Sequence, residues 1–174
     1  MTRAPLGWVA LAAALLLAAH ASRVDAAAPV REMRPFDAKS PESIRKTHAG
    51  KPFVLAFWSI YCEPCREEMA EWKAIRQKYP ALPIVLVSTD PPSERATVIE
   101  FLRRYDPGPV ETWVFADEFS ERVRYAVDRG WRGELPRTYF YDAAHRAEAR
   151  SGRFDPRWTE HWLANQAAGK RPVR

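Results

Sequence analysis

Apolar residues follow two different spacings along this chain, and the two spacings alternate. Continuous apolar runs at 52–58 and at 83–88 are typical of strands buried on both faces of a sheet. From Cys62 to Tyr79 the apolar residues instead recur every three or four positions, which predicts an amphipathic helix. The chain therefore contains a strand, helix and strand in succession.

Further elements are predicted from the same spacings and from turn and capping residues. They are a short helix with Ser40 as its N-cap, a proline-rich turn and helix at 90–105, a strand at 111–117, a helix at 119–127, a strand at 138–141 with a hairpin partner around 148–152, and a last helix at 155–166 with Asp155 as its N-cap. Strands that alternate with helices, followed by a hairpin and a helix, predict an α/β fold in which a sheet lies between two layers of helices.

The first residues of the chain have the layout of a secretory signal peptide. A positive charge at Arg3 is followed by an apolar core and then by small residues. The apolar core is shorter than the ~20 residues that a membrane span needs. We expect a signal peptide at 1–26, cleaved after Ala26 or alternatively after Ala28, and a mature domain at 27–174 without stable membrane insertion. An uncleaved membrane anchor is the alternative.

Charge changes this interpretation little. The chain has 27 lysines and arginines against 22 aspartates and glutamates, and the basic residues are scattered along it. Because no basic run is interleaved with aromatic residues, the charge is typical of solvated faces and excludes a nucleic-acid-binding surface. Export would place the domain in the periplasm, an oxidising compartment in which cysteines tend to be paired.

The candidate chemistry lies in the only two cysteines, Cys62 and Cys65, which follow the first apolar run and open the helix. As a structural staple the pair would contribute little, because closing a four-residue loop is worth about 2 kcal/mol against about 4.7 kcal/mol for a 100-residue loop. At a helix N-terminus, however, unpaired N–H groups and the helix dipole stabilise the Cys62 thiolate, and thiolate is the nucleophile of disulfide exchange. Cys65, one turn on, can then attack the resulting mixed disulfide. A redox role is favoured over a staple or a metal site.

Two sequence motifs resemble the thioredoxin superfamily. "FWSIYCEPC" resembles the strand end and C-x-x-C motif of that superfamily, and "GELPRTYFYD" resembles its second landmark, a cis-proline loop. The signal peptide, the motif "CEPCREE" and a helix–strand insert at 91–116 make the chain similar to the exported TlpA/ResA-like thiol–disulfide oxidoreductases. The resemblance covers about 36–166 and implies a thioredoxin-like three-layer α/β/α sandwich with a helix–strand insert.

The resemblance also implies roles for residues around the thiols. Pro136 corresponds to the cis-proline that faces the cysteine pair, and Leu135 before it shapes the substrate groove. Trp58 and Tyr61 lie beside the thiols in the sequence and are candidates to flank Cys62 and contact a substrate.

A carboxylate is expected to move protons during exchange. Thioredoxin has a buried aspartate six residues before its first cysteine, where this chain has Ala56. Glu68, three residues after Cys65, is on nearly the same helix face and matches a glutamate near the active site of ResA-like relatives. We expect Glu68 to be a general base and acid and Glu67, which points about 100° away, to be solvated. The alternative is that both are ordinary acidic residues of a helix N-terminus.

The function that these residues favour is reduction of protein disulfides without a cofactor or a metal. Glu63 adds negative charge beside Cys62, which favours the thiol and the reducing end of the scaffold's range. Substrates would be oxidised thiol proteins, such as an apocytochrome c or a copper-site protein, and a membrane-embedded carrier would supply electrons. The alternative is a periplasmic copper-binding chaperone that uses the same cysteines as soft ligands, without redox turnover, together with His48, His145 or His161.

Overall fold

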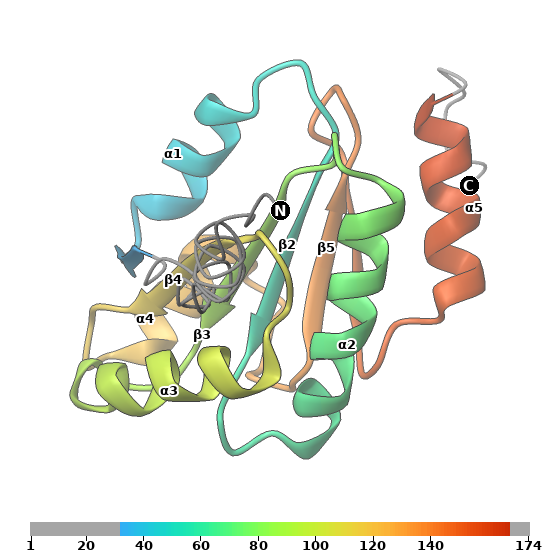
Figure 1. Ribbon diagram of the computed structural model, residues 1–174. Coiled ribbons are helices and arrows are strands. Elements are labelled where there is room, and N and C mark those ends of the chain that lie inside the picture. The colour runs from blue at the N-terminus through green and yellow to red at the C-terminus, as the bar shows by residue number, and fades with distance from the viewer. Residues whose placement is uncertain (1–31, 168–174) are drawn as a thin grey trace, which may run out of the picture. The chain divides into compact units, whose positions relative to one another are not determined.

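The structure, a computed structural model, describes residues 32–167 (Figure 1). Its twelve elements, in chain order, are β1 (Met33–Phe36), α1 (Ser40–Thr47), β2 (Phe53–Trp58), α2 (Glu63–Lys78), β3 (Ile84–Ser88), the short 3-10 helix η1 (Pro92–Glu94), α3 (Arg95–Tyr105), β4 (Glu111–Phe115), α4 (Ser120–Val127), β5 (Arg137–Tyr141), β6 (Ala147–Ser151) and α5 (Pro156–Ala167). The expected signal peptide at 1–26 lies outside the described residues. Among residues 32–167, no helix is long and apolar enough to cross a membrane.

The six strands form one mixed sheet in the order β1-β4-β3-β2-β5-β6. Strands β1, β4, β3 and β2 are parallel to one another, whereas β5 is antiparallel to β2 and β6 is antiparallel to β5. The two central strands, β2 and β3, are buried along their whole length, as continuous apolar runs require.

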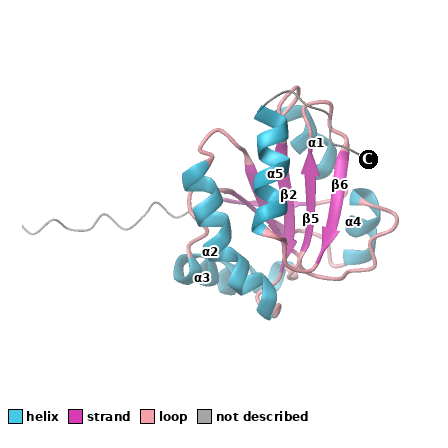
Figure 2. Cartoon of the chain, turned by 90° about the vertical axis from the view of Figure 1, so that its right-hand side faces the viewer, coloured by secondary structure: helices cyan, strands magenta, loops and turns pink. Residues whose placement is uncertain are grey.

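Helices cover both faces of the sheet, so that the domain has three layers. Figure 2 shows α2, α3 and α5 on one side of the sheet and α1 and α4 on the other. The alternation of side chains along β2 divides the core in the same way: Ala56 and Trp58 pack with α2 and α3, whereas Leu55 and Phe57 pack with α1 and α4. The expected three-layer α/β sandwich is confirmed, and so is the helix–strand insert, which consists of η1, α3 and β4.

Two details differ from the expectations. Strand β1 was not predicted, because only Met33 and Phe36 of its four residues are buried and it lies at the edge of the sheet. Ser40 is the first residue of α1 and not its N-cap; the carboxylate of Asp37 accepts the N–H groups of Lys39 and Ser40 instead. Asp155 does accept a hydrogen bond at the start of α5, from the N–H of Arg157 at 2.8 Å, as a capping residue should.

Candidate active site

One edge of the sheet gathers the residues with candidate chemistry. Parallel strands present their carboxyl ends at the same edge, so the loops that follow β2 and β3 lie side by side there. Strand β5 runs the other way and starts at this edge, since Arg137 is paired with Phe57 near the end of β2. The topology therefore brings Cys62, Asp90 and Pro136 to one place.

The cysteine pair caps the helix that carries it. Cys62 is the N-cap of α2, with an extended backbone, and its sulfur accepts the N–H of Cys65 at 3.3 Å. The two sulfurs form a disulfide with an S–S distance of 2.02 Å. Cys65 is completely buried, whereas Cys62 is partly exposed. This geometry suits exchange chemistry, because one sulfur is open to attack and both lie where the helix stabilises a thiolate.

The loop before Cys62 is held by a buried carboxylate that the sequence did not single out. Asp90, just after β3, is 3% exposed and accepts hydrogen bonds from the hydroxyl of Ser59 at 2.6 Å and from the N–H of Ile60 at 3.1 Å. The available signal was the position of Asp90 after a buried strand, where polar side chains face the functional edge of a parallel sheet. Its hydrogen-bond partners could not be predicted, because they lie in the loop after β2 and reach Asp90 only through the pairing of β2 with β3.

The proline loop has the predicted form. The peptide bond between Leu135 and Pro136 is cis, as expected from the sequence, and Leu135 packs against both core clusters. The carbonyl of Pro136 accepts the N–H of Gly152 at 2.8 Å. The loop is thus tied to the segment that follows β6.

Glu68 is buried on the inner face of α2. Its side chain is 2% exposed, and one carboxylate oxygen accepts the N–H of Phe154 at 3.0 Å. Burial raises the pKa of Glu68 to about 7, although the hydrogen bond from Phe154 and the charge of Arg153 oppose the shift. A carboxyl group with this pKa exchanges protons near neutral pH, as a general acid or base must.

A short connection joins the proline loop to the redox helix. It comprises residues 152–154, and it binds Pro136 through Gly152 and Glu68 through Phe154. Between them, Arg153 forms ion pairs with Glu67 at 2.6 Å and with Glu71 at 2.5 Å. Glu67 is exposed, as expected, and is also ion-paired. The contacts of the 152–154 connection were not predicted from the sequence.

The two aromatic candidates have different positions. Tyr61 is 76% exposed, and its hydroxyl donates to the carboxylate of Glu94 at 3.2 Å. Trp58 is only 2% exposed and packs against Phe101 of α3, with ring centroids 5.0 Å apart and the ring planes tilted by 34°. Expecting Trp58 to contact a substrate was wrong, because its side chain is buried in the core cluster that also contains Cys65.

The three histidines of the copper alternative do not gather around the thiols. His48 and His145 lie together at the other end of β2, where the ring of His145 is 3.0 Å from the carbonyl oxygen of His48. The length of β2 separates them from Cys62 by about 17 Å at ~3.3 Å per residue. His161 is exposed on α5. Within residues 32–167, no three side chains of the metal-binding types form a cluster.

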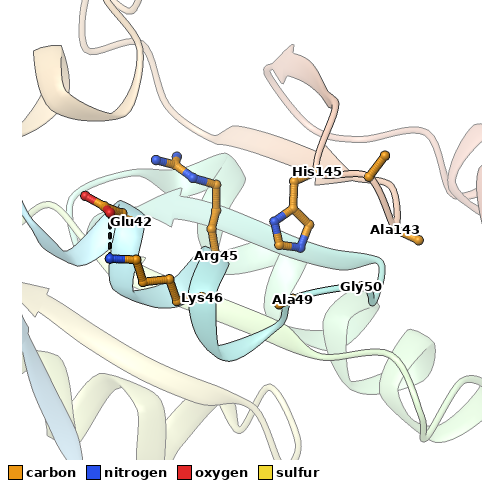
Figure 3. Close-up of a pocket in the computed structure, with 8 residues that line it drawn as sticks. Glu42, Arg45, Lys46, Ala49, Gly50, Ala143 and His145 are labelled. Carbon is orange, nitrogen blue, oxygen red and sulfur yellow. Dashed lines mark ion pairs between the residues drawn. The ribbon is translucent and has the colours of Figure 1, made fainter.

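A shallow pocket lies at the end of the sheet that carries His145, away from Cys62 and Cys65. Its walls include Arg45, Lys46 and His145, from α1 and the β5–β6 turn (Figure 3). Lys46 is already paired with Glu42 at 2.7 Å. The pocket therefore lies apart from the redox pair and contributes no residue to it.

Comparisons with known proteins relate the chain to thiol–disulfide oxidoreductases. No protein-family model matches the chain. Over 94 residues it is 27% identical to the thiol-disulfide oxidoreductase ResA of Bacillus thuringiensis subsp. konkukian, an alignment that covers 54% of this chain and 45% of ResA. The chain thus matches less than half of the length of that curated relative.

Solved structures resemble the domain over most of its length. One is a secreted disulfide oxidoreductase of Mycobacterium tuberculosis homologous to E. coli DsbE, with a TM-score of 0.55, 20% identity, and coverage of 71% of this chain and 85% of that one. Another is StoA from Bacillus subtilis, with a TM-score of 0.51, 17% identity, and coverage of 66% and 84%. The thioredoxin-like fold is confirmed, and so is the resemblance to ResA-like thiol–disulfide oxidoreductases.

Proposed function

We propose that this chain, a member of the thioredoxin superfamily, is an exported thiol–disulfide oxidoreductase that reduces disulfides of other proteins. One observation carries the proposal: a partly exposed Cys62 is bonded to a fully buried Cys65 at the N-terminus of α2. A disulfide that served only as a staple would gain little from this position, whereas an exchange reaction needs one accessible sulfur and one sheltered partner.

The reaction proceeds in two exchanges from the reduced form. The Cys62 thiolate attacks one sulfur of the substrate disulfide, forms a mixed disulfide and releases the other substrate sulfur as a thiolate, which takes up a proton. Cys65 then loses its proton and attacks Cys62, so that the Cys62–Cys65 disulfide forms and the second substrate thiol leaves. Two electrons and two protons pass to the substrate, and a membrane-embedded dithiol carrier restores the reduced pair.

We expect substrate contacts at the same edge of the sheet, where Tyr61 is exposed, Leu135 is half-buried and Pro136 is buried. The loop Leu135–Pro136 would offer backbone groups to an extended segment of an oxidised thiol protein, and Tyr61 would flank that segment. Trp58 would not contact the substrate but would pack in the core below the end of β2. Apocytochrome c and copper-site proteins are the substrate classes that we favour.

Glu68 would accept the proton of Cys65 and donate it back. Cys65 is buried and must ionise before it can resolve the mixed disulfide, and Glu68 lies one helical turn further along α2. With a pKa of about 7 it would accept that proton and return it when the pair is reduced.

The reduction potential of the Cys62–Cys65 pair tests the direction. We expect a value nearer to the −270 mV of thioredoxin than to the −120 mV of the oxidase DsbA, because Glu63 disfavours the Cys62 thiolate. Equilibration with glutathione buffers and turnover with insulin measure the potential and the activity. A potential at the oxidising end would refute the reductase role. Tight Cu(I) binding without turnover would instead support the copper chaperone.

Export is tested separately at the N-terminus. We expect mature protein recovered from the periplasm to begin at Ala27, because a charge, an apolar core and small residues occur in the order that signal peptidase reads. N-terminal sequencing makes the measurement. Intact protein in the membrane fraction would show that the segment is a retained anchor.

A further inference from the structure

A buried carboxylate hydrogen-bonded to the redox loop has no role in the exchange steps described above. Asp90 accepts hydrogen bonds from the hydroxyls of Ser59 and Ser88, both at 2.6 Å, and from the N–H of Ile60 at 3.1 Å. All of these groups are buried or partly buried. Buried hydrogen bonds to a carboxylate are among the stronger ones in proteins, and a missing partner is costly there.

The hydrogen bonds lead from Asp90 through Ser59 to the backbone of Cys62. Each serine hydroxyl donates its one hydrogen bond to Asp90. Each also accepts a hydrogen bond from a backbone N–H at 3.1 Å, Ser59 from Tyr61 and Ser88 from Asp90 itself. The carbonyl of Ser59 then accepts the N–H of Cys62 at 3.1 Å. Asp90 thus binds two groups of the turn from β2 to α2 directly, the hydroxyl of Ser59 and the N–H of Ile60, and orients the Ser59 oxygen that accepts the N–H of Tyr61.

We propose that Asp90 is a positioning residue that fixes the loop carrying Cys62 and thereby sets the redox equilibrium of the Cys62–Cys65 pair. This proposal rests on the redox function proposed above. Two thiols form a disulfide more favourably when the protein already holds their sulfurs close together, because less conformational freedom is lost when the bond forms. Asp90 holds the backbone on the Cys62 side, and α2 holds Cys65.

The substitution Asp90→Asn tests the idea with little change of shape. It replaces an acceptor oxygen with an NH₂ group that must face one of the three donors, so the loop loses at least one bond. We expect the equilibrium constant for oxidation of the pair by glutathione disulfide, which yields the protein disulfide and two glutathione thiols, to fall about tenfold. That change corresponds to a potential about 30 mV less negative.

Asp142→Asn is the matched control. Asp142 is also a buried aspartate that follows a strand and accepts backbone N–H groups, from Ala144 and Arg146, each at 2.9 Å. It lies in the β5–β6 turn, at the end of the sheet away from the thiols. We expect Asp142→Asn to lower the urea midpoint of unfolding and to leave the glutathione equilibrium unchanged.

Ser59→Ala provides a second variant if Asp90→Asn does not fold. It removes the hydroxyl that joins Asp90 to the N–H of Tyr61 and should shift the equilibrium in the same direction. Unchanged equilibria in the folded variants, or an equal shift in Asp142→Asn, would refute the positioning role. The glutathione measurement needs no protein substrate. If the wild-type pair equilibrates with glutathione but does not turn over insulin, the proposed function fails while the role of Asp90 can still be decided.

Discussion

Replacing Cys65 with serine will cause mixed disulfides to accumulate through Cys62, and turnover with a protein disulfide will be lost. The partly exposed Cys62 can still attack a substrate, but no second thiol remains to resolve the product. Replacing Cys62 with serine will also abolish turnover, without trapped partners, because Cys65 is 0% exposed. Non-reducing electrophoresis followed by mass spectrometry of the trapped species measures both outcomes.

The two variants control each other. The chain has only two cysteines, so each variant retains one thiol and any trapped species must form through it. Trapping by Cys62→Ser and not by Cys65→Ser would reverse the assignment of attacking and resolving thiols. Trapping by neither would argue against exchange with protein disulfides. The identity of the trapped partners would distinguish the proposed substrate classes.

Glu68→Gln should slow exchange at least tenfold at pH 7.5, since general acid–base catalysis contributes about 10²–10⁴. With a pKa of about 7, Glu68 is largely protonated below neutral pH and becomes a base above it, so the wild-type rate should rise through this range. The variant should lose the inflection near pH 7. Stopped-flow rates of exchange with a small disulfide between pH 5 and 9 provide the measurement.

Glu67→Gln is the matched control, because it makes the same change on the next residue, which is exposed and paired with Arg153. It should leave the pH profile unchanged. Equal, small effects of the two substitutions across the whole range would contradict a catalytic role for Glu68. A shared fall in stability without a change in the pH profile would also contradict it.

The same carboxyl group makes stability depend on pH in a predictable direction. The folded pKa of about 7 lies above the ordinary glutamate value of 4.5, so between these values the native state binds more protons than the unfolded state. Stability should therefore fall as pH rises from about 4.5 to 7, by up to about 3 kcal/mol at ~1.4 kcal/mol per pKa unit. Urea unfolding of the wild type and of Glu68→Gln, in which this contribution is absent, measures it.

The sequence predicted the central part of the fold because burial on both faces leaves a clear pattern. Strands β2 and β3 are continuous apolar runs, and α2 repeats its apolar residues with helical spacing. Strand β1 was missed because an edge strand is only half covered and its middle residues, Arg34 and Pro35, are exposed. The cap of α1 was misassigned because Asp37, three residues earlier, accepts the N–H groups of Lys39 and Ser40, while the Ser40 hydroxyl turns back to accept the N–H of Asp37.

The candidate site divides along similar lines. The Cys62–Cys65 pair was predictable because its two residues are close together in the sequence, and the cis bond before Pro136 was predictable because the local motif resembles that of the thioredoxin superfamily. Asp90 and the 152–154 connection were not, since they meet the redox loop and helix only through tertiary contacts between distant segments. Trp58 was placed wrongly for the related reason that adjacency in sequence to Cys62 does not show whether a side chain is covered; Trp58 packs on the same face as Cys65, but Phe101 of the distant helix α3 buries it.

The connection between β6 and α5 also restricts how the chain can vary in length. Surface loops commonly tolerate insertions, because lengthening them costs little closure entropy. In this connection, Gly152, Arg153 and Phe154 each bind a different point of the proline loop or of α2. One added or deleted residue would put at least one of these three contacts out of register. We therefore expect the length of the segment 152–154 to be fixed, unlike that of an ordinary surface loop.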